Sequence, residues 1–194
     1  MISKIEISFS ADLKIVSEIL ALQYKNLRQH LSPDDIESQG FVYVQHQPDV
    51  LQAICLSEPA VIATDRNVLA GYALCMNKDH AQKVPELVDF FKEIDQLQYE
   101  GIALCNTTYL ACGQICIAKE YRGQNLMRSL YRHMQLLNPK YQYCITEVSS
   151  LNVRSLHAHF KVGFVPLHKH YSAEQEEWQI LLWDWRKTNQ KVIE

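Results

Sequence analysis

The sequence predicts one α/β or α+β domain built around a mixed sheet. Three observations predict it. Runs with the two-residue period of a strand alternate with runs of helical period, and a strand–helix–strand segment lies in the second half of the chain. No Pro/Gly/Ser-rich linker, repeat or low-complexity tract divides the 194 residues. We therefore expect residues 1–194 to form a single domain.

The first half of the chain predicts a strand, two helices, a strand hairpin and a third helix. These elements cover residues 4–9, 11–30, 48–57, 60–64 with 68–76, and 80–98. The hairpin is expected because Asp65-Arg66-Asn67 separates two short apolar runs, which is typical of a tight turn between antiparallel strands.

The second half predicts strands and helices in alternation, followed by two more strands. They cover residues 109–117, 124–137, 141–148, 152–162, 164–171 and 177–185. Asn138-Pro139 ends the first of these helices. A helix between two strands favours a parallel crossover, whereas the final pair of strands favours antiparallel pairing, so the sheet should be mixed.

The charge balance argues against a mainly electrostatic nucleic-acid binder. Nineteen basic and 22 acidic residues give a net charge of −3 and a pI near 6.2. No stretch approaches the roughly 18 uncharged apolar residues that span a membrane, and the first residues lack the apolar core of a secretory signal. We expect a soluble, cytoplasmic protein without a nucleic-acid or membrane partner.

The six cysteines lie in apolar runs and are expected to be reduced core residues, as suits a reducing cytosol. No C-x-x-C pair occurs. His157 with His159, and His168 with His170, resemble metal-binding pairs only in their spacing, because no third and fourth ligands accompany them. No metal is therefore expected.

A candidate phosphate site lies where the strand at 109–117 runs into a helix, at Tyr121-Arg-Gly-Gln-Asn125. Exposed backbone N–H groups and the helix dipole favour an anion at such a helix start. Arg122 would add a charged donor beside it. Many such turns carry Arg-Gly for steric reasons alone, so this pattern leaves a purely structural role open.

A second pattern follows at Asn152-Val-Arg-Ser155-Leu-His-Ala-His159-Phe-Lys-Val-Gly163-Phe. Asn152 is a favourable N-cap, and Gly163 suits the position after a helix end. Helical spacing predicts a buried face, with His159 at its edge. That face comprises Val153, Leu156, His157 and Phe160. Capping and packing alone would explain this segment.

Taken together, the two patterns resemble the GNAT superfamily of acyl-CoA-dependent N-acyltransferases. The order of elements from residue 3 to about residue 186 is similar to that fold, most closely over residues 109–164. Leu69-Ala-Gly-Tyr-Ala-Leu74 also resembles the third strand of the family. The resemblance implies a mixed, mostly antiparallel sheet of about seven strands, flanked by helices, whose central parallel pair splays apart.

The resemblance also implies which residues hold acetyl-CoA, the acyl donor. Backbone groups of Ile115, Cys116 and Ile117 would pair with the pantetheine arm, and an amide near Ile117 would polarise the thioester carbonyl. Asn152 matches a family Asn that contacts the arm, and Ser155 matches a common small neighbour. The backbone amides implied to hold the pyrophosphate are those of Arg122, Gly123, Gln124, Asn125, Leu126 and Met127.

The sequence departs from the family pattern at three positions. Asn125 and Met127 replace small residues of the phosphate turn; Asn tolerates unusual dihedral angles, whereas the long Met side chain would crowd the phosphates. His159 stands where many members carry a tyrosine that protonates the leaving thiolate. The fold expectation is independent of all three departures.

Acetyl transfer needs a base for the amine, a donor for the oxyanion and an acid for coenzyme A. His159 could be the acid, with an ordinary pKa of about 6.5, or it could simply pack or line the cofactor. Glu147 is a candidate base that would act through a water, or it could pair structurally with Arg154. These two residues are the catalytic candidates.

The sequence therefore predicts an N-acetyltransferase that moves acetyl from acetyl-CoA to a primary amine of a small molecule or peptide. Direct transfer in a ternary complex is expected, because no Cys or Ser has an evident activating partner. The alternative is a non-catalytic acyl-CoA-binding or protein-interaction domain on the same fold. The acidic loop around Asp34 would favour a cationic amine, and C-terminal tryptophans would fill the core or the interface of a possible homodimer.

Overall fold

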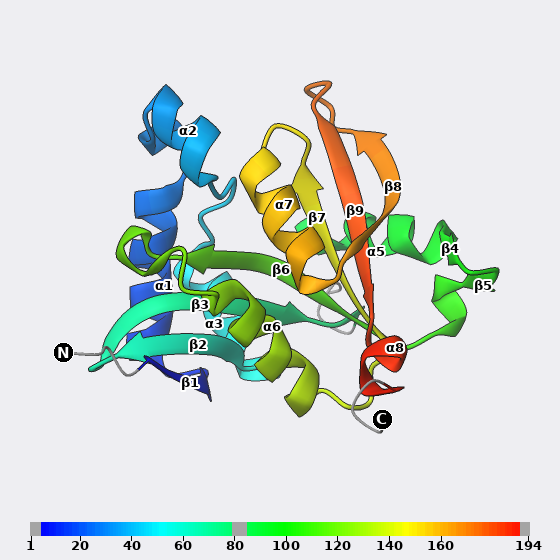
Figure 1. Ribbon diagram of the computed structural model, residues 1–194, viewed down its shortest axis with the longest axis horizontal. Helices are drawn as coiled ribbons and strands as arrows, with labels where there is room; N and C mark the ends of the chain where they lie inside the picture. Colours follow the sequence, from blue (N-terminus) through cyan, green and yellow to red (C-terminus); the bar gives the residue numbers. More distant parts are fainter. Residues whose placement is uncertain (1–4, 79–84, 191–194) are drawn as a thin grey trace.

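The computed structural model describes residues 5–78 and 85–190, so the expected starts at residues 4 and 80 lie outside it. Its centre is a seven-stranded sheet in the order β1-β2-β3-β6-β7-β9-β8 (Figure 1). The strands are β1 (Ile5–Ser10), β2 (Ala60–Asp65), β3 (Val68–Met76), β6 (Tyr109–Ile117), β7 (Tyr143–Ser149), β8 (Val165–Tyr171) and β9 (Glu177–Asp184). Only β6 and β7 pair in parallel, which confirms the mixed, mostly antiparallel sheet. A separate small hairpin pairs β4 (Gln98–Tyr99) with β5 (Ile102–Ala103).

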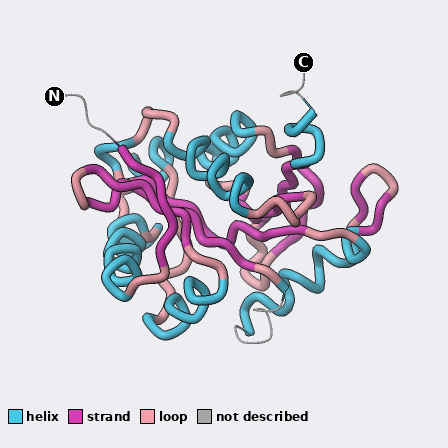
Figure 2. The backbone as a smooth tube through the Cα atoms, turned by 90° about the horizontal axis from the view of Figure 1, so that it is seen from below, coloured by secondary structure: helices cyan, strands magenta, loops and turns pink. Residues whose placement is uncertain are grey.

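Helices cover both faces of the sheet (Figure 2). One face packs against α1 (Leu13–Asn26), α3 (Pro48–Ser57) and α5 (Pro85–Gln96), and the other against α6 (Leu126–Leu137) and α7 (Val153–Val162). Two shorter helices are α2 (Pro33–Gln39) and α8 (Trp185–Gln190). No helix in the described ranges is long and apolar enough to cross a membrane.

The helix expected over residues 11–30 is interrupted. It ends at Asn26, and a separate 3-10 turn follows at Arg28–His30. Leu27 between them is extended and forms a parallel bridge with Val42. The side chain of Asn26 donates to the Leu22 carbonyl of the last helical turn at 2.8 Å. This break brings the loop at 40–47 against α1.

The predicted hairpin is confirmed as the tight connection between β2 and β3. Asp65 pairs with Val68, which leaves a loop of Arg66 and Asn67. Both residues have positive φ, at 49° and 69°. Two successive left-handed residues are the signature of a type I′ turn, whose twist suits a two-residue hairpin.

The central strands diverge after a short paired segment. The parallel pairing of β6 with β7 ends at Ala111 and Ile145, and the two strands then run apart toward their carboxyl ends (Figure 1). Thr146 Oγ1 donates to the Cys112 carbonyl at 2.9 Å and fixes the point of divergence. Beyond it, β6 keeps β3 on one side and opens on the other. This is the splayed parallel pair expected from the resemblance.

A bulge marks the same place on the other edge of β6. The register of β6 against β3 shifts by one residue at Gly113. A Cβ there would lie 2.3 Å from Met76 Sδ, so the side chain of Met76 occupies the space that any other residue would need. Glycine thus allows the strand to bend where the opening begins.

The buried face of α7 differs from the expectation. Leu156, His159 and Val162 are buried, whereas Val153 and Phe160 are exposed. Leu156 is buried as predicted, but the rest of that face was wrong, because helical spacing alone does not decide which side of the helix meets the sheet. His159 is buried at low cost since it is hydrogen-bonded within the core.

Five cysteines are buried as expected, but Cys105 is exposed in the loop before β6, which corrects the expectation for that residue. Trp183 and Trp185 are buried in the core, whereas Trp178 lines a cavity. Core packing therefore explains two of the three tryptophans.

Candidate functional site

Two adjoining cavities open around the divergence of β6 and β7. The turn cavity, of about 350 Å³, lies between residues 123–128 and α7. The sheet cavity, of about 450 Å³, lies between the loop at 40–47, β6 and β7. Ile115 and Ser155 line both, so the cavities meet at this point.

Backbone groups of β6 face the opening in alternation. Ala118 N donates to Ala70 O of the β3 side at 2.9 Å. Every second residue of an antiparallel strand directs its backbone N–H and C=O groups to the same neighbouring strand. The backbone groups of Cys116 therefore also face β3. Those of Ile115 and Ile117 face the opening instead. Ile115 lines both cavities, whereas Ile117 lines only the turn cavity.

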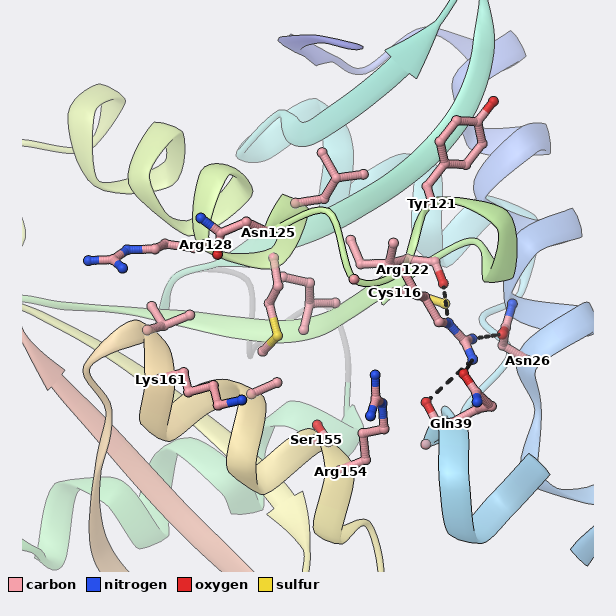
Figure 3. A pocket seen from close by; sticks show the side chains of 18 of the residues that line it. Asn26, Gln39, Cys116, Tyr121, Arg122, Asn125, Arg128, Arg154, Ser155 and Lys161 are labelled. Carbon is pink, nitrogen blue, oxygen red and sulfur yellow. Dashed lines mark hydrogen bonds between the residues drawn. The ribbon is translucent and has the colours of Figure 1, made fainter. Parts of the chain in front are cut away.

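The side chain of Arg122 braces the end of β6. Its Nε donates to the Ile117 carbonyl at 3.0 Å, and its Nη2 donates to Asn26 Oδ1 at 2.6 Å. Its Nη1 donates to the carbonyl and the side-chain oxygen of Gln39, at 3.4 and 3.3 Å (Figure 3). The backbone N–H of Arg122 donates to Lys119 O. The guanidinium expected beside a phosphate is thus bonded to protein acceptors on α1, α2 and β6.

The expected phosphate turn lies at the start of α6. Gly123 and Asn125 both have positive φ, at 76° and 62°, and the helix starts at Leu126. Asn125 therefore adopts the left-handed conformation that glycine would adopt, as its side chain allows. Met127 packs partly against the core and lines the turn cavity, whereas Gln124 is exposed. The N–H groups of the first helical turn remain for a ligand.

Three basic residues surround this turn, and the sequence interpretation did not select them for this role. Arg128 follows the turn on α6, and Arg154 and Lys161 extend from α7 across the turn cavity (Figure 3). All three are exposed. We call them the basic rim. The signal that could have identified them is positional, because Arg154 and Lys161 are seven residues apart and so lie on one side of a helix.

Asn152, which lines the sheet cavity, carries a buried acceptor. The residue is 5% exposed, and its Nδ2 donates to the Phe41 carbonyl at 2.8 Å. Its Oδ1 is buried without a hydrogen-bond partner, so it does not cap α7 with its side chain. Gly40 has a φ of 74°, and a Cβ on it would lie 2.8 Å from that oxygen. A buried acceptor left open in this way suits a ligand N–H.

His159 lies under the sheet cavity with both ring nitrogens bonded. Nδ1 lies 2.8 Å from the Ser155 carbonyl, an acceptor, so Nδ1 carries the proton. Nε2 lies 2.8 Å from the Tyr131 hydroxyl, which donates to it. Burial lowers the pKa of His159 to about 4, so the ring is neutral at pH 7. The acid role expected of His159 would require both hydrogen bonds to rearrange.

Glu147 lies in the wall of the sheet cavity, on β7. It pairs with Nε2 of His170 on β8 rather than with Arg154. Burial raises the pKa of Glu147, and the negative charge of Glu93 adds to this rise. The positive charge and the hydrogen bond of His170 lower the pKa, but it remains above its ordinary value. A carboxylate in this state can take a proton from an ammonium group.

A polar cluster that the sequence interpretation missed closes the far end of the sheet cavity. The Tyr43 hydroxyl donates to Glu176 and lies 3.2 Å from Ser149 Oγ. Arg28 Nη1 lies 3.2 Å from Glu176 Oε2. The ring of Tyr43 packs on Trp178, with centroids 4.7 Å apart. Burial, aided by Glu176, raises the pKa of Tyr43 to about 12, so this hydroxyl stays protonated.

Within residues 5–78 and 85–190, no group of three or more His, Cys, Asp or Glu side chains is placed to hold a metal ion. His168 and His170 each lie 3.7 Å from Glu93.

Comparisons with known proteins identify the fold. No protein-family model matches the sequence, and no curated protein matches it. Solved structures do match over most of the chain. A GNAT-family acetyltransferase of Streptococcus agalactiae is 16% identical with a TM-score of 0.64, and covers 93% of this chain and 95% of its own.

Two further structures were solved with ligands. The yncA protein of Salmonella typhimurium, with its cofactor acetyl-CoA, is 12% identical with a TM-score of 0.59, over 93% of both chains. A chain of the NatC complex, bound to Gag peptide and CoA, is 13% identical with a TM-score of 0.61, over 93% of this chain and 98% of that one. At these identities the likeness establishes the fold, and it confirms the GNAT-like architecture expected from the sequence.

Proposed function

We propose, from the fold shared with GNAT acetyltransferases, that this chain transfers acetyl from acetyl-CoA to a primary amine of a small molecule or peptide. The single observation that carries the proposal is the junction at Ile115, which lines both cavities. On one side of it lies a helix start with a basic rim, and on the other lies the carboxylate of Glu147. A phosphate-bearing donor and an amine acceptor would meet there.

The residues present fit coenzyme A. The backbone N–H groups at 123–127 and the basic rim offer donors and charge to the pyrophosphate. The backbone N–H and C=O of Ile115 and the N–H of Ile117 suit the amides of the pantetheine arm, as does the open Oδ1 of Asn152. Ser155, which lines both cavities, would lie beside the arm.

The chemistry then follows from Glu147 and Ile115. An amine at pH 7 arrives as an ammonium ion, so Glu147 takes one proton, directly or through a water, before the nitrogen attacks. Since Ile115 rather than Ile117 reaches the sheet cavity, its N–H is the donor that we assign to the developing oxyanion. The second amine proton leaves with the thiol, and the acid role predicted for His159 in that step would require its two hydrogen bonds in the core to break first.

The cysteines at the opening support direct transfer over an acyl-enzyme. Burial raises the pKa of both Cys112 and Cys116 to about 12. The thiolate is the nucleophile in acyl transfer to cysteine, and these groups are thiols at neutral pH. A ternary complex of chain, acetyl-CoA and amine is therefore the route that we propose.

A panel assay tests the function. Titration calorimetry should show one acetyl-CoA site per chain, and release of free thiol should rise with at least one primary amine. Saturable binding of acetyl-CoA without thiol release for any amine would contradict acetyl transfer and support the alternative, a non-catalytic acyl-CoA-binding domain. No heat of binding at millimolar acetyl-CoA would remove both functions.

The proposal includes a setting for this reaction. We place the chain in the cytoplasm as a single domain, acting without metal, nucleic acid or membrane, and as a possible homodimer. Light scattering of the purified chain decides the oligomeric state, and a dimer interface must lie elsewhere than on Trp183 and Trp185, which are buried within the chain.

A further inference from the structure

A row of carboxylates and imidazoles leads from the sheet cavity to solvent. Glu147 Oε1 and His170 Nε2 share a hydrogen bond, and His170 Nδ1 lies 3.7 Å from Glu93 Oε2 on α5. The other oxygen of Glu93 lies 3.7 Å from His168 Nε2. Exposure of these side chains is 26% for Glu147, 24% for His170, 33% for Glu93 and 43% for His168. The row thus begins in the cavity wall and ends at the surface.

A bulge in β8 places the two histidines in this row. Ile180 of β9 pairs with Glu147 on one side and with His168 on the other, so the three side chains share one face of the sheet. The register of β8 shifts between Pro166 and His168, which makes Leu167 an extra residue. Without that extra residue, His168 and His170 would lie on the opposite face, because a slip of one residue reverses every side chain.

Among the side chains that the structure describes, no other charged group is bonded to Glu147 or His170. Between Glu147 and His170, β9 presents only Ile180 and Trp178. Of the described titratable groups, those that face His170 are Glu147 from β7 and Glu93 from α5, with His168 beyond Glu93. An imidazole held between two carboxylates can accept a proton at one nitrogen while it releases one at the other.

We propose that His170 is a proton-relay and positioning residue that holds Glu147 toward the acceptor and carries its proton to Glu93 and solvent. The inference rests on the proposed acetyl transfer. That reaction converts one ammonium ion and one thioester into one amide, one thiol and one free proton. Glu147 receives the free proton from the ammonium nitrogen and passes it to Nε2 of a His170 ring that carries its own proton on Nδ1, which gives an imidazolium. The imidazolium releases its Nδ1 proton to Glu93 or to water. Exchange with water then removes the proton from Nε2 and restores one to Nδ1, so that both groups return to their starting state.

Kinetic variants test the relay with the fastest amine of the panel. His170→Gln should lower kcat about tenfold and leave the KM for acetyl-CoA unchanged, because proton transfer by a positioned group typically contributes a factor of 10² to 10⁴, of which Glu147 keeps a part. His170→Gly should recover rate in proportion to added imidazole, since the side chain is partly exposed. Lys169→Gln is the matched control, because Lys169 lies on the other face of β8 and pairs with Glu177. An absence of imidazole rescue, together with an unchanged pH profile in His170→Gln, would overturn the relay.

A titration without substrate separates this inference from the proposed function. In the free protein, the nuclear magnetic resonance signals of the His170 ring should report the ionisation of Glu147, because the two side chains share a hydrogen bond, and Glu147→Gln should remove that inflection. Ring signals with no inflection from Glu147, or one that persists in Glu147→Gln, would overturn the coupling, whatever the activity. If no amine is acetylated, the proposed function fails, and the titration still decides whether Glu147 and His170 exchange a proton.

Discussion

Arg122 Nη2 donates to Asn26 Oδ1 at 2.6 Å, which ties the turn after β6 to the last residue of α1. Asn26 is buried, and its own amide donates to the Leu22 carbonyl. The same guanidinium holds the Ile117 carbonyl. The charge of Arg122 therefore positions the backbone of the turn, and the basic rim supplies the charge that faces the turn cavity.

Arg122→Ala should lower the free energy of unfolding by about 1–3 kcal/mol, because it leaves buried acceptors without donors. It should also weaken acetyl-CoA binding, through displacement of the turn. Urea unfolding and titration calorimetry measure the two effects. Asn26→Ala should act in the same direction, and the double variant should cost less than the sum of the two. Strict additivity would show that the two side chains do not act together.

Alanine at Arg128, Arg154 or Lys161 should weaken coenzyme A binding with little change in stability, since all three side chains are exposed. Each loss should shrink as salt rises, because exposed charges are screened within about 8 Å at physiological ionic strength. Pantetheine, which lacks the phosphates, serves as the control ligand. Equal losses for pantetheine and coenzyme A would place the rim outside the phosphate site.

The neutral state of His159 predicts a stability that depends on pH. Its pKa is about 4 in the folded chain against an ordinary value of 6.5, so between these values only the unfolded chain takes up the proton. The free energy of unfolding should therefore fall as pH drops from 6.5 toward 4, by roughly 3 kcal/mol in total. Urea unfolding at several pH values measures this fall. His159→Phe should flatten that part of the curve, whereas His157→Gln, an exposed position on the same helix, should retain it.

The fold could be predicted from sequence because local patterns and one pair of motifs agree. The two-residue turn at Arg66 and Asn67, the strand–helix–strand segment and Gly163 after α7 are all local signals. The left-handed conformation of Asn125 was also predictable, because Asn stands in the turn at a position where a small residue is expected and tolerates positive φ.

The site was less predictable, because its decisive contacts join distant segments. Arg122 reaches Asn26, 96 residues away, and His170 reaches Glu147 only because of a bulge that no pattern in the sequence indicates. His159 is buried among partners on α6 and its own helix, whereas helical spacing alone placed Phe160 on the buried face. Sequence spacing assigns residues to a helix or strand, but tertiary contacts decide what each side chain bonds.

The hydrogen bonds of His159 also predict its effect on turnover. With Nδ1–H on the Ser155 carbonyl and Nε2 accepting from Tyr131, the neutral ring has no N–H left for a thiolate. His159→Phe should therefore keep kcat within a few-fold of the wild type at pH 7.5, measured as thiol release at saturating amine. A loss of about tenfold or more with unchanged acetyl-CoA affinity would instead establish the acid role.

Glu147→Gln should have the largest effect on turnover. Gln cannot accept the ammonium proton, so kcat should fall by about 10² to 10⁴, the usual contribution of a positioned base, while acetyl-CoA affinity stays unchanged. Because burial raises the pKa of Glu147, wild-type activity should decline on the acidic side at a pH above the ordinary range of a carboxyl group. The group is active when ionised, so activity rises with pH through that pKa and then levels. The residual activity of Glu147→Gln should lack this acidic limb. If the limb persists in the variant, another group titrates there, and Glu147 is not the base.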